Sequence, residues 1–189
     1  MVNVRGVIQV GANVGQEVSI LKQYTENIML IEPLPNLANQ LKLKYPNYII
    51  IETALGNENS ERDFFVASNG GESSSILKPK KHIEIYPSIT FNETRKVFVR
   101  RFDSLNIDIK GYNVLITDTQ GCDLDVLKGF GDSLNVFDLI ICEYIDVELY
   151  ENNQGLDLFL KYLTNFQMVE TFDNNSGAGN VAFKRITNV

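Results

Sequence analysis

The chain has 189 residues, and its 44% hydrophobic content is enough for one domain with a substantial buried core. The formal charge of −7, with 24 acidic and 17 basic residues, excludes a nucleic-acid-binding surface, which needs positive charge against phosphates. No apolar run approaches the ~20 residues of a membrane span, so we expect no membrane partner.

The amino-terminal residues contain no hydrophobic signal segment, and two cysteines, Cys122 and Cys142, are too few for a disulfide framework. Both features predict a cytoplasmic protein with reduced, buried thiols. There is no internal repeat or linker, so residues 1–189 are expected to form a single domain. The sequence does not indicate an oligomeric state.

The first predicted strand, Val7–Val10, runs into the glycine turn Gly11-Ala-Asn-Val-Gly15. A helix is predicted from about Gln16 to Tyr24 by the spacing of its apolar residues. Glycines at such a strand–helix junction let the backbone turn tightly and let a ligand approach its N–H groups.

The second predicted strand, Asn27–Ile31, ends in Glu32, roughly 20 residues after the first glycine. A carboxylate at this place can accept hydrogen bonds from the ribose hydroxyls of a nucleotide-like ligand. The glycine turn and the strand-end acid together predict a site for an adenosine-containing cofactor.

A second helix begins near Pro35, with Leu37, Leu41 and Tyr45 on one face, and a third strand follows at 48–52. This alternation of strands and helices predicts right-handed parallel crossovers and an open α/β sheet.

The middle of the chain is less regular. Strands are predicted at 62–66 and 96–102, while residues 78–94 give no firm prediction. The polar stretch 68–75 between them looks too poor in apolar residues to pack. It fits either a mobile functional loop or a solvated connection.

Regular spacing returns in the last third. A buried strand, 114–117, ends in Asp118, a helix follows Gly121, and a strand at 137–142 ends in Glu143. A polar loop, 144–153, leads to a helix around 156–163. Strands at 167–172 and 181–185, joined by the turn-forming segment 173–180, are expected to form an antiparallel hairpin at the sheet edge.

The ends of these parallel strands should meet along one rim of the sheet, where ligands of such folds bind. Gly11, Glu32, Thr53, Asp118 and Glu143 are all predicted to lie there. A single strand-end acid is often only a loop cap, but several together favour a binding site. Asp118, Asp123 and Glu143 also offer oxygen ligands for a hard cation, although nothing requires a metal.

Several of these motifs occur in an order that resembles the FkbM-type S-adenosylmethionine-dependent methyltransferases. The resemblance runs from about Val7 to Lys184 and implies a seven-stranded, mostly parallel Rossmann-like sheet with an antiparallel C-terminal strand and helices on both faces. It also implies O-methylation of a hydroxyl on a sugar, glycan or small metabolite. The matching motifs are Gly11–Gly15, Glu32-Pro33, Ala54-Leu55-Gly56, serines 73–75, Asp118-Thr-Gln-Gly121, Val126–Gly129, Glu143 and Leu149-Tyr150-Glu151.

The resemblance assigns roles to individual positions. Asp118 would accept the proton of the acceptor or orient it, and Glu143 would line the same pocket. Ser74, Ser75, His82 and Tyr150, on the loops 67–95 and 144–155, are expected to bind the acceptor. S-adenosylmethionine would be held by Gln9, Gly11, Ala12, Asn13, Gly15, Gln16, Glu32, Pro33, Thr53, Ala54, Leu55 and Asp118.

Two positions depart from the family pattern. Gln9 stands where members usually carry Asp, and Thr117 stands where many carry Lys. Loss of the charge at position 9 leaves open a second hypothesis, a catalytically inactive binding module with the same fold. A nicotinamide dehydrogenase is disfavoured because the turn reads Gly-x-Asn-x-Gly rather than Gly-x-Gly-x-x-Gly.

Overall fold

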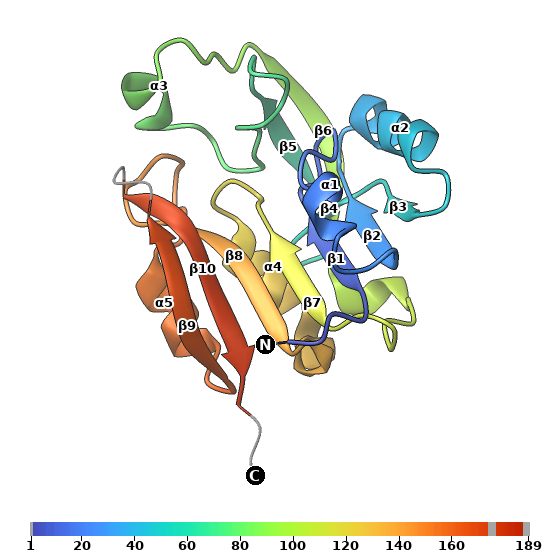
Figure 1. Ribbon diagram of the computed structural model, residues 1–189. Helices are drawn as coiled ribbons and strands as arrows, with labels where there is room; N and C mark the ends of the chain where they lie inside the picture. The colour runs from blue at the N-terminus through green and yellow to red at the C-terminus, as the bar shows by residue number, and fades with distance from the viewer. Residues whose placement is uncertain (1, 174–176, 187–189) are drawn as a thin grey trace.

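The computed structural model describes residues 2–173 and 177–186. A seven-stranded sheet runs through the molecule and confirms the predicted architecture (Figure 1). Its strands, in spatial order, are β3 (Ile49–Ile51), β2 (Ile28–Ile31), β1 (Val7–Val10), β7 (Val114–Thr117), β8 (Leu139–Ile145), β10 (Ala178–Arg185) and β9 (Phe166–Asp173).

The first five strands in this order are parallel, and β10 is antiparallel to both β8 and β9. β1 and β7 lie side by side at the centre, with Val10 opposite Thr117. Gly11 and Asp118 directly follow these two strands. The pairing therefore brings them together, although they are 107 positions apart in the sequence.

Gly11 is required where β1 meets β7. Its φ of +81° lies in the left-handed region, and a Cβ at this position would stand 1.9 Å from the backbone oxygen of Asp118. Any side chain here would force the two strand ends apart.

The two faces of β1 pack against different helices because its side chains alternate between them. Ile8 and Val10 belong to the main core, together with residues of α4 (Asp123–Phe130) and α5 (Leu156–Tyr162). Val7 packs on the other face with residues of α1 (Val18–Leu21) and α2 (Pro35–Lys44).

The helix α1 is shorter than the predicted 16–24. Val18 and Leu21 are buried, but Ile20 and Tyr24 are exposed, so the later residues add little packing to hold further helical turns. Hydrogen-bonded turns continue the chain to Thr25 in place of a regular helix.

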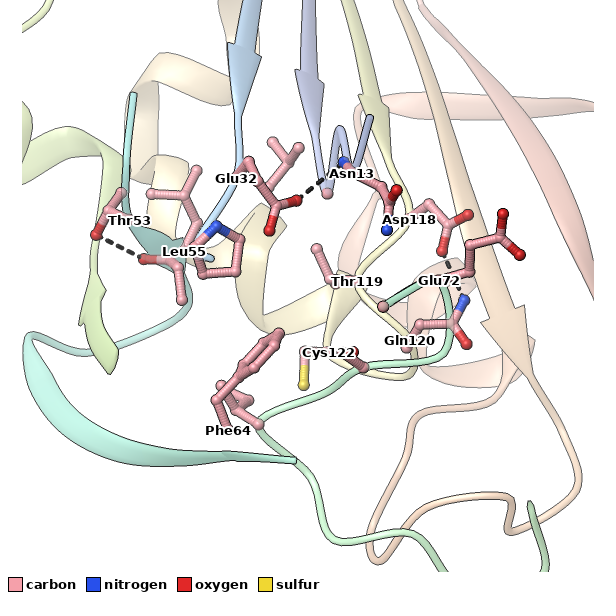
Figure 2. Close-up of a pocket in the computed structure, with 17 residues that line it drawn as sticks. Asn13, Glu32, Thr53, Leu55, Phe64, Glu72, Asp118, Thr119, Gln120 and Cys122 are labelled. Carbon is pink, nitrogen blue, oxygen red and sulfur yellow. Dashed lines mark hydrogen bonds between the residues drawn. The ribbon is translucent and has the colours of Figure 1, made fainter. Parts of the chain in front are cut away.

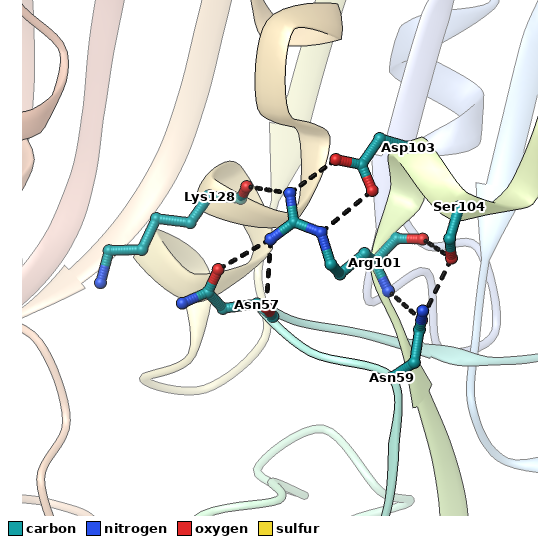
Figure 3. Close-up of polar contacts among 6 residues, drawn as sticks. All are labelled: Asn57, Asn59, Arg101, Asp103, Ser104 and Lys128. Atoms are coloured by element: carbon teal, nitrogen blue, oxygen red, sulfur yellow. Dashed lines mark hydrogen bonds and ion pairs between the residues drawn. The ribbon is translucent and has the colours of Figure 1, made fainter.

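A second, three-stranded sheet lies beside the main one, with the order β4 (Ala54–Leu55), β6 (Glu93–Arg100) and β5 (Ser60–Val66). Arg101, at the end of β6, ties this sheet to α4 (Figure 3). Its guanidinium donates to the carbonyl of Lys128 and to Asn57, and it pairs with Asp103 in the 3-10 helix η1 (Phe102–Leu105). A second 3-10 helix, η2 (Gly131–Val136), follows α4.

Two local predictions were wrong. Glu143 lies inside β8, not after it, because Tyr144 and Ile145 are buried and continue the pairing with β10. The polar stretch 68–75 does pack: Ser74 Oγ accepts from the N–H of Ala67, and Ser75 Oγ donates to the carbonyl of Gln120. Hydrogen bonds take the place of apolar contacts there.

The segment without a prediction contains one short helix, α3 (His82–Ile85). The predicted turn 173–180 is too long, because Asp173 is the last residue of β9 and residues 178–180 begin β10; residues 174–176 lie outside the described residues. Within residues 2–173 and 177–186, no helix has both the length and the apolar content needed to cross a bilayer.

The contact between Gly11 and Asp118 predicts the effect of a matched pair of substitutions. Gly70 also has a positive φ of +72°, but a Cβ there meets nothing within 4 Å. Both Gly11→Ala and Gly70→Ala should lose about 1 kcal/mol from the strained φ, and Gly11→Ala should lose at least ~2 kcal/mol more from the clash. Urea unfolding monitored by circular dichroism measures the difference, and equal losses would contradict the proposed close approach.

Candidate functional site

A pocket opens at the carboxyl ends of the parallel strands, with about 540 Å³ of empty space including its open mouth. One side is a largely apolar slot whose walls come from β4 and β5 of the smaller sheet and from loops that include the residue after Glu32 (Figure 2). The other side, beyond Asn13, carries Asp118, Glu72 and Gln120. The slot is lined by Pro33, Ala54, Leu55, Phe64, Ile76 and Cys122.

Glu32 links the glycine turn to the second strand. Its carboxylate accepts the N–H of Asn13 at 2.9 Å on Oε2 and the N–H of Leu34 at 2.9 Å on Oε1. Asn13 suits this turn because it tolerates its left-handed φ of 45° better than most residues do. The two hydrogen bonds fix the direction of the carboxyl group at the pocket wall.

Burial sets the protonation of this carboxyl. Glu32 is 4% exposed, and desolvation raises its pKa to about 7 despite the two N–H groups, which favour the charged form. A ligand with hydroxyl donors would lower this pKa again by hydrogen-bonding to the carboxylate.

Gln120 joins the two acids that the sequence singled out. Its side-chain N–H₂ donates to Asp118 Oδ1 at 2.7 Å and to Glu143 Oε2 at 3.1 Å, and its Oε1 accepts from the hydroxyl of Tyr150. Gln120 adopts a positive φ of 54°, a costly conformation for this residue type that is often found at functional sites. No role was predicted for it, although its strained backbone belongs to the Asp118–Gly121 motif.

The acids of this region perturb one another. Asp118 keeps solvent contact at the mouth of the pocket, but the surrounding protein raises its pKa by desolvation, with the charges of Glu17 and Glu72 adding to the effect. Burial also raises the pKa of Glu143, and the charges of Asp118 and Asp123 raise it further. A positive charge placed among these groups would be favoured.

Asp123, 1% exposed, supports the loop that carries Asp118. Its carboxylate accepts the N–H of Thr119 at 3.2 Å, while burial and the neighbouring Asp118 raise its pKa to about 7. In the described part of the chain, no three His, Cys, Asp or Glu side chains are grouped so as to hold a metal ion.

Most of the predicted cofactor residues line this one pocket. Gln9, Ala12, Gly15 and Gln16 do not line it, although they belong to the strand and turn behind it. Ser74 lines the pocket, whereas Glu143 and the other predicted acceptor residues, Ser75, His82 and Tyr150, do not. The lining residues that were predicted are Gly11, Asn13, Glu32, Pro33, Thr53, Ala54, Leu55 and Asp118.

His82 and Tyr150 lie behind the pocket in an aromatic cluster. His82 is 3% exposed and contacts the rings of Tyr86, Phe91 and Tyr150, with centroid separations of 5.0 to 5.5 Å. Burial lowers the pKa of His82, so its ring is held neutral. Tyr150 reaches the pocket indirectly, through its hydrogen bond to Gln120.

Residues 67–77, here called the capping segment, close over the glycine turn. Asn13 Nδ2 donates to the carbonyl of Gly70 at 3.1 Å, and Gln16 Nε2 donates to Glu72 at 3.2 Å. The capping segment thereby adds Glu72, Ser74 and Ile76 to the pocket wall. Glu72 was not predicted, because nothing in its polar surroundings marks it in the sequence.

The raised pKa values predict how stability depends on pH. Glu32 and Asp123 each have a folded-state pKa of about 7, above the unfolded values near 4, so folding favours their neutral forms. Their stabilising effect is full below about pH 4 and is lost as pH rises through 7. The melting temperature without ligand should therefore fall by about 5 °C or more between pH 5.5 and 8.

Thermal unfolding by circular dichroism measures this slope. Asp123→Asn should flatten it by removing one titrating group while keeping an oxygen to accept from Thr119. Carboxyls with lowered pKa, such as Asp103 and Asp138, titrate below this window. A melting temperature that is constant or rises from pH 5.5 to 8 would contradict the burial of these acids.

Solved structures with similar folds are methyltransferases. A putative type 11 methyltransferase from Sulfolobus solfataricus aligns with a TM-score of 0.56 at 11% identity, covering 97% of this chain and 86% of that one. A ribosomal protein L11 methylase from Lactobacillus delbrueckii subsp. bulgaricus aligns with a TM-score of 0.54 at 11% identity, covering 99% and 72%. At these identities the likeness establishes the fold.

The sequence comparisons identify the family. The chain is 27% identical over 179 residues to the 2-O-methyltransferase NoeI of Sinorhizobium fredii (strain NBRC 101917 / NGR234), covering 88% of this chain and 74% of that protein. The model of the methyltransferase FkbM domain matches residues 9–174. Members of this family take their methyl group from S-adenosylmethionine. With most of its length matched, this chain belongs to the FkbM family of methyltransferases.

Proposed function

We propose that this chain is an O-methyltransferase that transfers a methyl group to a hydroxyl of a sugar, glycan or small metabolite. The observation that carries the proposal is the Asp118 carboxylate, which Gln120 holds at the end of the pocket away from the apolar slot. The similarity to a protein named as a 2-O-methyltransferase supports oxygen as the accepting atom.

The parts of the pocket, from the slot to the acidic end, suit the successive parts of the cofactor, from the purine to the sulfonium. The slot between Leu55 and Phe64 suits a flat, apolar purine, and Glu32 lies where ribose hydroxyls would donate to it. The acidic end suits the positive sulfonium, because the pKa values of Asp118 and Glu143 are raised by burial and by their acidic neighbours.

When bound, S-adenosylmethionine supplies an already activated methyl group, so the protein's task is to position the acceptor oxygen and receive its proton. Gln120 donates to Oδ1 of Asp118, so Oδ2 would be the atom that accepts from an acceptor hydroxyl. The raised pKa of Asp118 makes this carboxylate a better proton acceptor than an ordinary aspartate. Glu143 acts through the same glutamine and keeps its amide in place.

The acceptor would be selected by the loops 67–95 and 144–155. Backbone hydrogen bonds join the two loops. The N–H groups of Lys80 and His82 donate to the carbonyl of Leu149, and the N–H of Glu151 donates to the carbonyl of Lys78. Ser74 faces the pocket directly, while Ser75, His82 and Tyr150 shape its wall from behind.

The role of Glu32 predicts a loss of cofactor affinity. Glu32→Ala should weaken the binding of S-adenosylhomocysteine by about tenfold or more, because two ribose hydroxyls lose a charged acceptor. Glu52→Ala is the matched control: Glu52 follows the neighbouring strand β3, but its carboxylate pairs with Lys42 outside the pocket. Calorimetry should find the control unchanged, and equal affinity in both variants would reject the ribose assignment.

The role of Asp118 predicts a loss of turnover with little loss of cofactor affinity. Asp118→Asn keeps the shape but removes the proton acceptor, so kcat should fall by roughly 10²-fold or more. The Kd for S-adenosylhomocysteine, which lacks the positive sulfonium, should change by less than about threefold. Asp125→Asn, on the outer side of α4 beside Lys128, is the control. Unchanged turnover in Asp118→Asn would remove the catalytic assignment.

The accepting atom is tested with S-adenosylmethionine carrying a labelled methyl group and a panel of sugars, oligosaccharides and polyhydroxylated metabolites. The label should appear in a methyl ether, identified by mass spectrometry and NMR of the product. Label found on nitrogen, or on RNA or protein, would contradict the proposal. Binding of the cofactor without transfer to any acceptor would favour the inactive binding module.

A further inference from the structure

The amide that replaces the family's usual acid is paired with a carboxylate. Gln9 Nε2 donates to Glu17 Oε2 at 2.8 Å. The contact arises because Gln9 shares a strand face with Val7, which packs against α1, and Glu17 is the residue that precedes α1. The position thus retains a negative charge next to β1, carried by a side chain from the next element.

Gln9 and Glu17 do not line the pocket themselves, but Gln9 directly precedes Val10 and Gly11, which do, and it has an unused acceptor. Gln9 is 2% exposed, and its Oε1 has no hydrogen-bond partner among the described residues. An unpaired buried acceptor is costly, and natural proteins usually give it a partner. The exposed carboxylate of Glu17 is close enough to Asp118 for its charge to raise the pKa of that group.

The pocket's axis shows which part of the cofactor would reach this pair. The adenosine end would lie in the slot and at Glu32, and the sulfur would lie near Asp118, at the other side of the pocket. The amino-acid tail leaves the sulfur on the side away from the ribose, so it continues past Asp118, away from Glu32. Two carboxylates lie toward this end: Glu72, which lines the pocket and accepts from Gln16, and Glu17, which accepts from Gln9. The Glu17 side also offers the buried Oε1 of Gln9, which is unpaired in the described part of the chain and which a further N–H of an ammonium group can satisfy.

We propose that Glu17, held in place by Gln9, binds the α-ammonium group of the cofactor's methionine tail, replacing the acid that the family usually carries at position 9. This inference rests on the proposed use of S-adenosylmethionine at the site. The charge has moved from the strand to the start of α1, and the binding chemistry is kept.

The test compares S-adenosylhomocysteine with its deaminated analogue, which lacks the α-amino group, and with methylthioadenosine, which lacks the whole tail. Glu17→Gln retains a side-chain oxygen to accept from Gln9 but removes the charge. It should weaken S-adenosylhomocysteine binding by about tenfold and leave the Kd values of the other two ligands within about twofold. Glu170→Gln, an exposed glutamate of β9, is the control and should leave all three unchanged.

A charge-swap variant sharpens the test. Gln9→Glu combined with Glu17→Gln returns the carboxylate to the strand, and it should restore S-adenosylhomocysteine binding to within about threefold of the original chain. Circular dichroism melts check that each variant is folded. If this double variant is unfolded, the single variant alone decides the matter.

Four results would overturn the inference. The first is that Glu17→Gln binds S-adenosylhomocysteine as tightly as the original chain does. The second is that Glu17→Gln loses affinity equally for the deaminated analogue, which excludes an effect through the ammonium group. The third is that Glu72→Gln, and not Glu17→Gln, weakens the binding of S-adenosylhomocysteine while leaving that of the deaminated analogue unchanged. This result would assign the role to Glu72 in the capping segment. Failure of the original chain to bind any of the three ligands would overturn the proposed function as well.

Discussion

Like charges crowd the carboxyl edge of the central sheet. Asp118 and Glu143 share one amide from Gln120, and Glu17, Glu72 and Asp123 act electrostatically on one or both of them. The described residues that line the pocket include no Lys or Arg. The protein leaves this charge uncompensated and accepts raised pKa values in return. A cofactor with a sulfonium and an ammonium group supplies the missing positive charge, so the same repulsion that weakens the ligand-free fold favours binding.

The order of the strands creates this arrangement. Parallel strands end on the same side, and the central pairing of β1 with β7 puts the glycine turn against Asp118. The second strand adds Glu32 next to the turn, fixed by the N–H of Asn13. Three short strands therefore place Glu32, the proposed ribose acceptor, and Asp118, the proposed proton acceptor, in one pocket, while β4 and β5 of the smaller sheet supply apolar walls where we propose that the base binds.

The main strands and the acids at their ends were largely predictable from the sequence, because they depend on periodic patterns of apolar residues. Buried strands of four residues followed by a single acid gave Glu32 and Asp118 their positions, and the parallel topology brought them together. Glu143 was predicted to follow its strand but lies within it, since β8 continues past this polar residue through the buried Tyr144 and Ile145. The capping segment was mistaken for an unpacked loop because serine hydroxyls, which carry no periodic signal, hold it in place.

The contacts that complete the site depend on side chains from distant segments, so no local pattern predicts them. Gln120 bridges two acids from neighbouring strands, and Glu17 compensates for a change at Gln9 only because α1 begins beside β1. Glu72 reaches the pocket because the capping segment folds back onto Asn13. Residues of this kind are identified only once the three-dimensional structure is known, whereas the strand-end acids are identified from their spacing along the sequence.

The central claim is that one pocket, built on the glycine turn, holds the whole cofactor from base to methyl donor. A crystal structure with S-adenosylhomocysteine tests it most directly. We expect adenine between Leu55 and Phe64, both ribose hydroxyls on the Glu32 carboxylate and the sulfur beside Asp118. A nucleoside bound elsewhere, or a Glu32 carboxylate turned away from the ribose, would contradict it.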